Sequence, residues 1–140
     1  MSDLMEDIIS TAESFAKNFT DKGNFDFSRE SLRDVNSILE EIGDFVFDDE
    51  ALYNYYTMVG SYIFEVARRN YGGKYYWLEE EQQPILVAGE PDYSVSIKAW
   101  DKAKKYIENG ADEDILFYID GFKEHVEKGK SNKGYRVVII

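Results

Sequence analysis

The sequence predicts an α+β fold in which N-terminal helices are followed by a small, mostly antiparallel sheet, two further helices and a C-terminal strand. Two changes of pattern lead to this prediction. Apolar residues recur every three or four positions up to residue 71, every second position from Lys74, and every three or four positions again after residue 98. The 140 residues contain no internal repeat and no linker-like tract, so a single domain over residues 1–140 is expected.

The N-terminal half has the signals of three helices. Helical spacing of apolar residues predicts them over residues 3–21, 29–42 and 49–71. Ser28 is placed as the N-cap of the second helix, and Gly43 is expected to end it. Asp48 or Asp49 can cap the third helix. Because that helix is apolar or aromatic nearly all round, it is expected to be central or to form part of a contact surface.

The C-terminal half begins with segments whose residues follow a period of two, as in β-strands. Strands are predicted over residues 75–78, 85–88 and 93–97, joined by loops of hairpin length and composition. Helices follow over residues 99–107 and 115–126, with Asp112 as a possible cap of the second. The chain ends in Val-Val-Ile-Ile, which predicts a strand whose edge must be paired or covered to avoid aggregation.

Composition and charge restrict the classes of protein that fit. The chain has no cysteine, and its first residues lack the basic start and apolar run of a signal peptide, so a cytoplasmic protein is expected. Residues 1–50 contain 14 acidic and 4 basic side chains and carry −10 of the net charge of −12. Such a field repels nucleic acid and anionic lipid and attracts a basic protein. The alternative interpretation of this acidity is that it only keeps the protein soluble.

The residues that often carry catalysis or metal binding are sparse here. His125 is the only histidine, no nucleophile motif accompanies it, and a surface position is predicted. The acidic runs at residues 48–50, 79–81 and 112–114 do not have the ligand pattern of an EF-hand, and are interpreted as helix caps and a turn. Residues 72–74, Gly-Gly-Lys, follow a helix instead of opening one, so they are not a phosphate loop. No metal or cofactor is predicted.

Glu65 stands out because Arg68 and Arg69 follow it at ion-pair spacing on the third helix. A salt bridge on the helix surface is the favoured interpretation. The alternative is a pocket formed by Tyr62, Glu65, Arg69 and Trp77.

The segment GSYIFEVARRNYGG, residues 60–73, resembles a helix in short uncharacterised bacterial proteins, some of which are immunity-like partners of toxins. The resemblance extends over residues 25–90. It implies a bacterial or phage origin and supplies no catalytic residues.

These observations favour an acidic protein-binding module, such as an immunity protein or inhibitor that neutralises a basic partner, over an enzyme. Its predicted binding residues combine acids with surface aromatics, which are frequent interface anchors. They are Asp44, Asp48, Asp49, Glu50, Tyr53 and Tyr55. Three alternatives remain: an inhibitor that mimics nucleic-acid charge against a DNA-binding defence protein, a small enzyme with a carboxylate site around Glu65, and a structural role in an oligomer.

Overall fold

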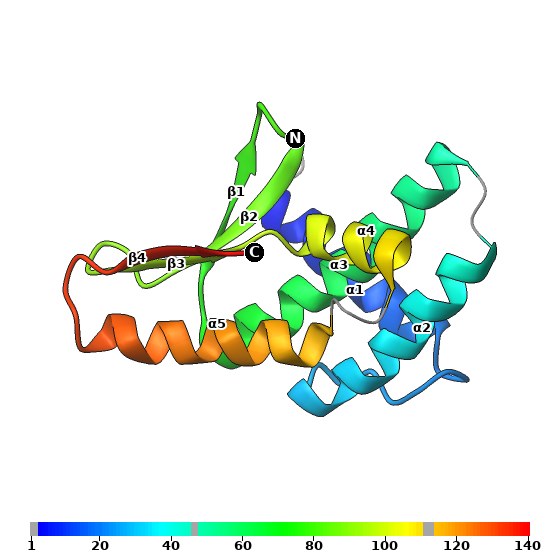
Figure 1. Cartoon of the computed structure of the whole chain (residues 1–140), viewed down its shortest axis with the longest axis horizontal. Helices are drawn as coiled ribbons and strands as arrows, with labels where there is room; N and C mark the ends of the chain where they lie inside the picture. The colour runs from blue at the N-terminus through cyan, green and yellow to red at the C-terminus, as the bar shows by residue number, and fades with distance from the viewer. Residues whose placement is uncertain (1–2, 46–47, 111–113) are drawn as a thin grey trace.

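The computed structural model describes residues 3–45, 48–110 and 114–140, and these residues have the predicted α+β fold (Figure 1). The order of elements is helices, sheet, helices and a last strand. They are α1 (Leu4–Asn18), the 3-10 turn η1 (Arg29–Ser31), α2 (Leu32–Phe45), α3 (Asp49–Tyr71), β1 (Lys74–Leu78), β2 (Gln83–Ala88), β3 (Ser94–Ile97), α4 (Ala99–Asn109), α5 (Ile115–Lys130) and β4 (Arg136–Ile139).

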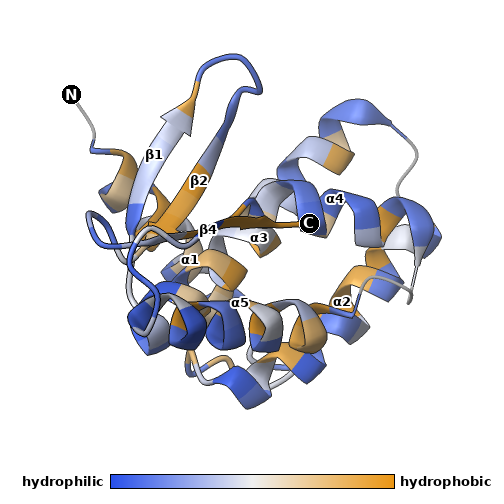
Figure 2. Cartoon of the chain, turned by 60° about the vertical axis from the view of Figure 1, so that its left-hand side comes forward, coloured by the Kyte–Doolittle hydropathy of each residue, from blue (hydrophilic) through white to orange (hydrophobic). Residues whose placement is uncertain are grey.

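The four strands form one sheet in the order β1-β2-β3-β4. The first three pair antiparallel as the predicted meander, and β4 pairs parallel with β3. The C-terminal strand is therefore paired, as expected, along one of its edges. The inner strand β2 carries an apolar stretch, orange in Figure 2, beside the paler edge strand β1. Helix α5 runs along β3 and β4 (Figure 1).

Helix α3 lies at the centre of the molecule. Residues 59–67 are buried on every side of the helix, and α3 packs against α1, α2, α4 and α5. The prediction that an all-round apolar helix is central is thus confirmed for its second half. The apolar residues of the helices and the sheet join in one continuous core.

The ends of the helices correct one detail of the prediction and confirm another. Gly43 does not end the second helix, because α2 continues to Phe45. A Cβ at Gly43 would lie 3.0 Å from the carbonyl oxygen of Ile107 in α4, so the glycine permits close packing of two helices. Asp48 caps α3 by accepting a hydrogen bond from the amide of Ala51 at 2.8 Å.

The N-cap of α5 is Asp114, which accepts a hydrogen bond from the amide of Leu116 at 2.9 Å. The cap predicted at Asp112 lies outside the described residues.

Candidate functional site

The four residues predicted to share one pocket lie in three different environments. Tyr62, Glu65 and Arg69 come from the second half of α3, and Trp77 comes from β1. Glu65 and Arg69 belong to a buried ionic network, Tyr62 packs in the aromatic core, and Trp77 lines a separate hollow. The structure thus divides the predicted set: Glu65 and Arg69 share one network, and the strand residue that joins them is Tyr75 instead of Trp77.

Glu65 is fully buried, which corrects the prediction of a salt bridge on the helix surface. Arg68 donates to both of its oxygens, from Nε at 2.6 Å and from Nη2 at 2.8 Å. Arg69 Nε donates at 2.9 Å, and the hydroxyl of Tyr75 in β1 donates at 2.8 Å. Four donors thus occupy the lone pairs of the carboxylate. A role as general base would require this network to open.

The network also sets the charge of Glu65. Burial raises the pKa of a carboxyl group, but the hydrogen bonds from Arg68, Tyr75 and Arg69 together hold the pKa of Glu65 below its ordinary value. Burial and the adjacent Glu65 carboxylate raise the pKa of Tyr75 far above its ordinary value. Glu65 is therefore ionised and Tyr75 is neutral at physiological pH, which is the state that a donor hydroxyl and an acceptor carboxylate need.

Tyr62 and Arg69 both contact Phe27, whose backbone has a φ of 66°. The Tyr62 hydroxyl accepts a hydrogen bond from the Phe27 amide at 3.0 Å and lies 2.7 Å from Ser31 Oγ. The Arg69 guanidinium lies 3.8 Å from the centre of the Phe27 ring. These contacts hold the segment before η1 against α3. Tyr62 therefore stabilises the fold.

Trp77 lines a surface hollow with a volume of about 250 Å³ between α1, α3, β1 and α4. We call it the aromatic hollow. Its rings are those of Tyr53, Trp77 and Trp100: Trp77 and Trp100 have centroids 6.0 Å apart and Tyr53 and Trp100 6.3 Å apart, each pair at an interplanar angle of 79°. The remaining lining residues are Leu4, Asp7, Ile8 and Thr11 of α1 and Thr57 and Ser61 of α3.

The position of Trp100 follows from two small residues in α3. A Cβ at Gly60 would lie 2.8 Å from Trp100 Cα, so only glycine lets α4 approach this closely. The next residue, Ser61, accepts a hydrogen bond from Trp100 Nε1 at 3.1 Å and donates to the carbonyl of Thr57 at 2.7 Å. The indole is thus fixed by its polar edge, and the partly buried Trp100 side chain lines the hollow.

Sequence reasoning missed Asp7, Thr57, Ser61 and Trp100 as members of a site. A signal was present for Trp100, since a glycine and a serine in the middle of a helix are unfavourable unless another element packs closely there. It did not identify which element approaches. Tyr53 and Trp77, which were predicted in different groups, are brought together by the fold.

The predicted acidic residues surround the junction of α2 and α3. Asp44, Asp48, Asp49 and Glu50 are all exposed. Asp48 also caps α3, as its position predicted. Tyr55 is half-buried, and its ring packs edge-on against that of Phe45, with the ring centroids 5.6 Å apart. Tyr53 is 47% exposed and forms part of the aromatic hollow.

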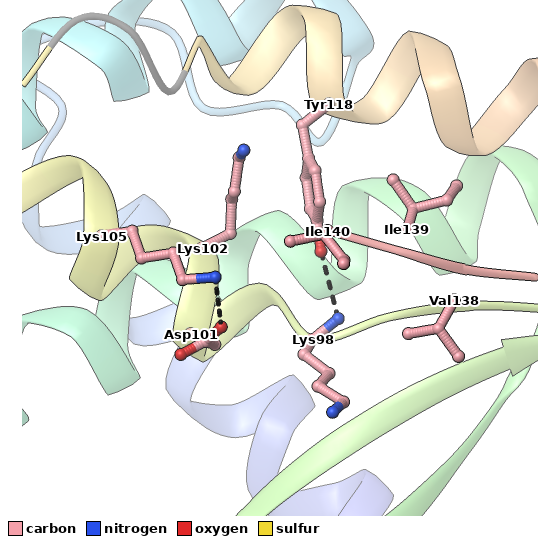
Figure 3. Close-up of a pocket in the computed structure, with 8 residues that line it drawn as sticks. All are labelled: Lys98, Asp101, Lys102, Lys105, Tyr118, Val138, Ile139 and Ile140. Atoms are coloured by element: carbon pink, nitrogen blue, oxygen red, sulfur yellow. Dashed lines mark hydrogen bonds and ion pairs between the residues drawn. The ribbon is translucent and has the colours of Figure 1, made fainter.

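A second hollow, of about 200 Å³, is lined by Lys98, Lys102 and Lys105 and by residues 138–140 (Figure 3). Lys105 pairs with Asp101 at 3.2 Å, and Lys98 pairs with Glu81 at 2.9 Å. The bond from Lys98 lowers the pKa of Glu81. The second acidic run thus contributes a partner to a lysine, and carboxylates offset part of the positive charge here.

His125 is half-buried, not on the open surface as predicted. Its Nδ1 is within hydrogen-bond distance of the hydroxyl of Tyr135, and the two rings stack. In the described ranges, no group of three or more histidine, aspartate or glutamate side chains is arranged to hold a metal ion. No helix in the same part of the chain has both the length and the apolar composition to cross a bilayer.

Comparison of the chain with protein-family models, with curated proteins and with solved structures produced no match.

Proposed function

We propose that this protein is an acidic protein-binding module that docks a basic protein partner, in the manner of an immunity protein or inhibitor. The observation that supports it is that exposed acids and an exposed ring follow one another along the first turns of α3. Asp49 and Glu50 open the helix, and Tyr53 follows Glu50 by one turn at the rim of the aromatic hollow. We call this surface the docking face. It comprises Asp44, Asp48, Asp49, Glu50, Tyr53, Trp77 and Trp100.

The two kinds of residue in the docking face act at different stages of binding. Exposed carboxylates raise the rate of encounter with a basic surface, and salt screens this effect. Large rings hold the complex after it forms, because they lose contact with water there. Trp77 is 40% exposed and Tyr53 is 47% exposed, so both have surface left to bury.

The first test needs a partner, which affinity capture from the source organism with mass spectrometry would provide. Stopped-flow kinetics then compare the wild type with a variant carrying Asp44→Asn, Asp48→Asn, Asp49→Asn and Glu50→Gln. Asparagine at position 48 keeps a capping side chain. Association should slow by about tenfold at low salt, with little change in dissociation, and high salt should remove the difference.

A matched control neutralises four exposed acids outside the docking face: Asp21, Glu30, Asp92 and Glu124. If the two variants slow association equally, net charge alone is responsible and the docking face is wrong. Competition by duplex DNA for the same partner would favour the mimic of nucleic-acid charge that the sequence also allowed.

The second test concerns the rings. Trp77→Ala should raise the dissociation rate about tenfold, as expected for loss of an interface anchor. Its control is Tyr76→Ala, because Tyr76 is the next residue of β1, is 45% exposed and points to the other side of the sheet. An equal effect of both substitutions, or of neither, would contradict the proposed anchor.

A further inference from the structure

We infer that the aromatic hollow binds the ammonium group of a lysine side chain presented by the basic partner. This inference rests on the proposed function and makes it specific: the docking face contains a defined place for one cationic residue. The argument uses the arrangement of the rings, the charge of the lining and the shape of the hollow.

The rings form a corner. Trp77 and Tyr53 each stand at 79° to Trp100, with centroids 6.0 and 6.3 Å from it. A cation within about 6 Å of the faces of several aromatic rings is attracted to each of them, and tryptophan gives the strongest attraction. Two of the three walls here are tryptophans.

The lining carries one charge, and it is negative. Among the described residues that line the hollow, Asp7 is the only ionised one, and it is exposed on the first turn of α1. Thr11 and Thr57 contribute hydroxyl groups to the same lining. A bound ammonium group would therefore find a carboxylate and hydroxyl acceptors from separate residues, which suits its three donors.

Size and shape favour lysine over arginine. Leu4 and Ile8 of α1 provide apolar surface for an aliphatic stem, and a volume of about 250 Å³ accommodates one side chain. A guanidinium is flat and stacks on a single plane, whereas crossed rings enclose a compact charge from several sides. The corner and the separated acceptors thus select the ammonium group.

The protein contains its own reporter for this site. Its only two tryptophans are Trp77 and Trp100, and both line the hollow. A ¹⁵N-labelled sample should therefore show two indole N–H signals, each from a wall of the proposed site. Apart from the ¹⁵N label, no added probe is needed to localise binding.

The experiment titrates the full chain with Nα-acetyl-lysine methylamide at constant ionic strength and follows both indole signals. The control ligand is the same compound acetylated at Nε, which keeps the stem and removes the charge. We expect the charged ligand to shift both signals along a saturable curve and the neutral ligand to bind at least fivefold more weakly. Equal shifts with both ligands, or none with either, would overturn the inference. So would equal or tighter binding of the arginine analogue.

Two variants test the geometry. Asp7→Asn should weaken binding of the charged ligand several-fold, while Glu6→Gln, an equal loss of charge at the neighbouring exposed position of α1, should not. Trp77→Ala should weaken it too, with the Trp100 signal remaining as the reporter. If Glu6→Gln weakens binding as much as Asp7→Asn, attraction is diffuse and the assigned site is wrong.

These results separate the two proposals. If the lysine analogue binds at the hollow but affinity capture finds no basic protein partner, the cation site is supported and the proposed function is refuted. A basic partner whose association depends on the acids at residues 44–50, with no lysine binding at the hollow, would preserve the function and refute this inference.

Discussion

The two halves of α3 use similar residues in opposite ways. Residues 49–58 carry acids and tyrosines, and none of them is fully buried, whereas residues 59–67 are all buried. In the buried half, Glu65 has a donor for each lone pair. In the exposed half, Glu50 and Tyr53 face solvent. Whether a glutamate near a tyrosine stabilises the fold or binds a partner is thus decided by what packs around it.

The largest expected effect is on the buried half. Glu65→Gln would leave Arg68 and Arg69 without their shared carboxylate, and breaking such a pair costs about 3 kcal/mol of unfolding free energy. The matched control is Glu13→Gln. Glu13 also pairs with Arg69, at 3.6 Å, but its side chain is 61% exposed, so the expected loss is below about 0.5 kcal/mol. Urea unfolding of both variants measures the difference, and equal losses would show that burial does not set the cost.

The contribution of Glu65 to the free energy of unfolding also depends on pH. Because the pKa of Glu65 is lowered in the folded protein, its contribution is fully present above the ordinary value of 4.5 and is lost as pH falls through the lowered folded value. The stability difference between wild type and Glu65→Gln should therefore be constant near neutral pH and shrink below about pH 4.5. A difference that grows on acidification would contradict the assigned ionisation state.

Gly60 lies at the start of the buried half, and its substitution should have the next largest effect. Gly60→Ala places a Cβ 2.8 Å from Trp100 Cα and Cδ1, so α4 must move. We expect a loss of about 2 kcal/mol despite the better helix propensity of alanine. The control is Gly121→Ala in α5, where a Cβ meets nothing within 4 Å and a gain of about 0.5 kcal/mol is expected. Thermal unfolding of both compares them, and a gain at Gly60 would refute the close contact.

The order of elements could be predicted from the sequence because it depends on local periodicity and caps. The change of period at Lys74 marked the start of β1, and the acidic pair Asp48-Asp49 marked the start of α3. Gly43 misled the prediction because a glycine that ends a helix and a glycine that admits a neighbouring helix look alike in sequence. The distinction lies in Ile107, which is distant along the chain.

The site could be predicted only in part for the same reason. Spacing paired Glu65 with Arg68 and Arg69, and that pairing is confirmed. Its burial depends on Tyr75 and on elements packed around α3, which periodicity does not report. Likewise, the aromatic hollow joins Asp7, Tyr53 and Trp100 from three helices, so no local pattern could group them.

The smallest expected effect on stability comes from removing one tyrosine hydroxyl. Two neighbouring residues of β1 are compared: the hydroxyl of Tyr75 belongs to the Glu65 network, and that of Tyr76 is exposed. Tyr75→Phe removes the donor to Glu65 but keeps the ring that packs edge-on against Phe64 at 5.3 Å. The carboxylate retains three donors from the arginines, so the loss should be about 1 kcal/mol, the usual net value of one hydrogen bond. Tyr76→Phe removes the hydroxyl that donates to Glu90 at 2.8 Å in open solvent, where water replaces it, so stability should not change measurably. Denaturant midpoints at equal slope give both values. If the two substitutions cost the same, the Tyr75 hydroxyl is not part of the network, and the coupling of β1 to α3 depends on packing alone.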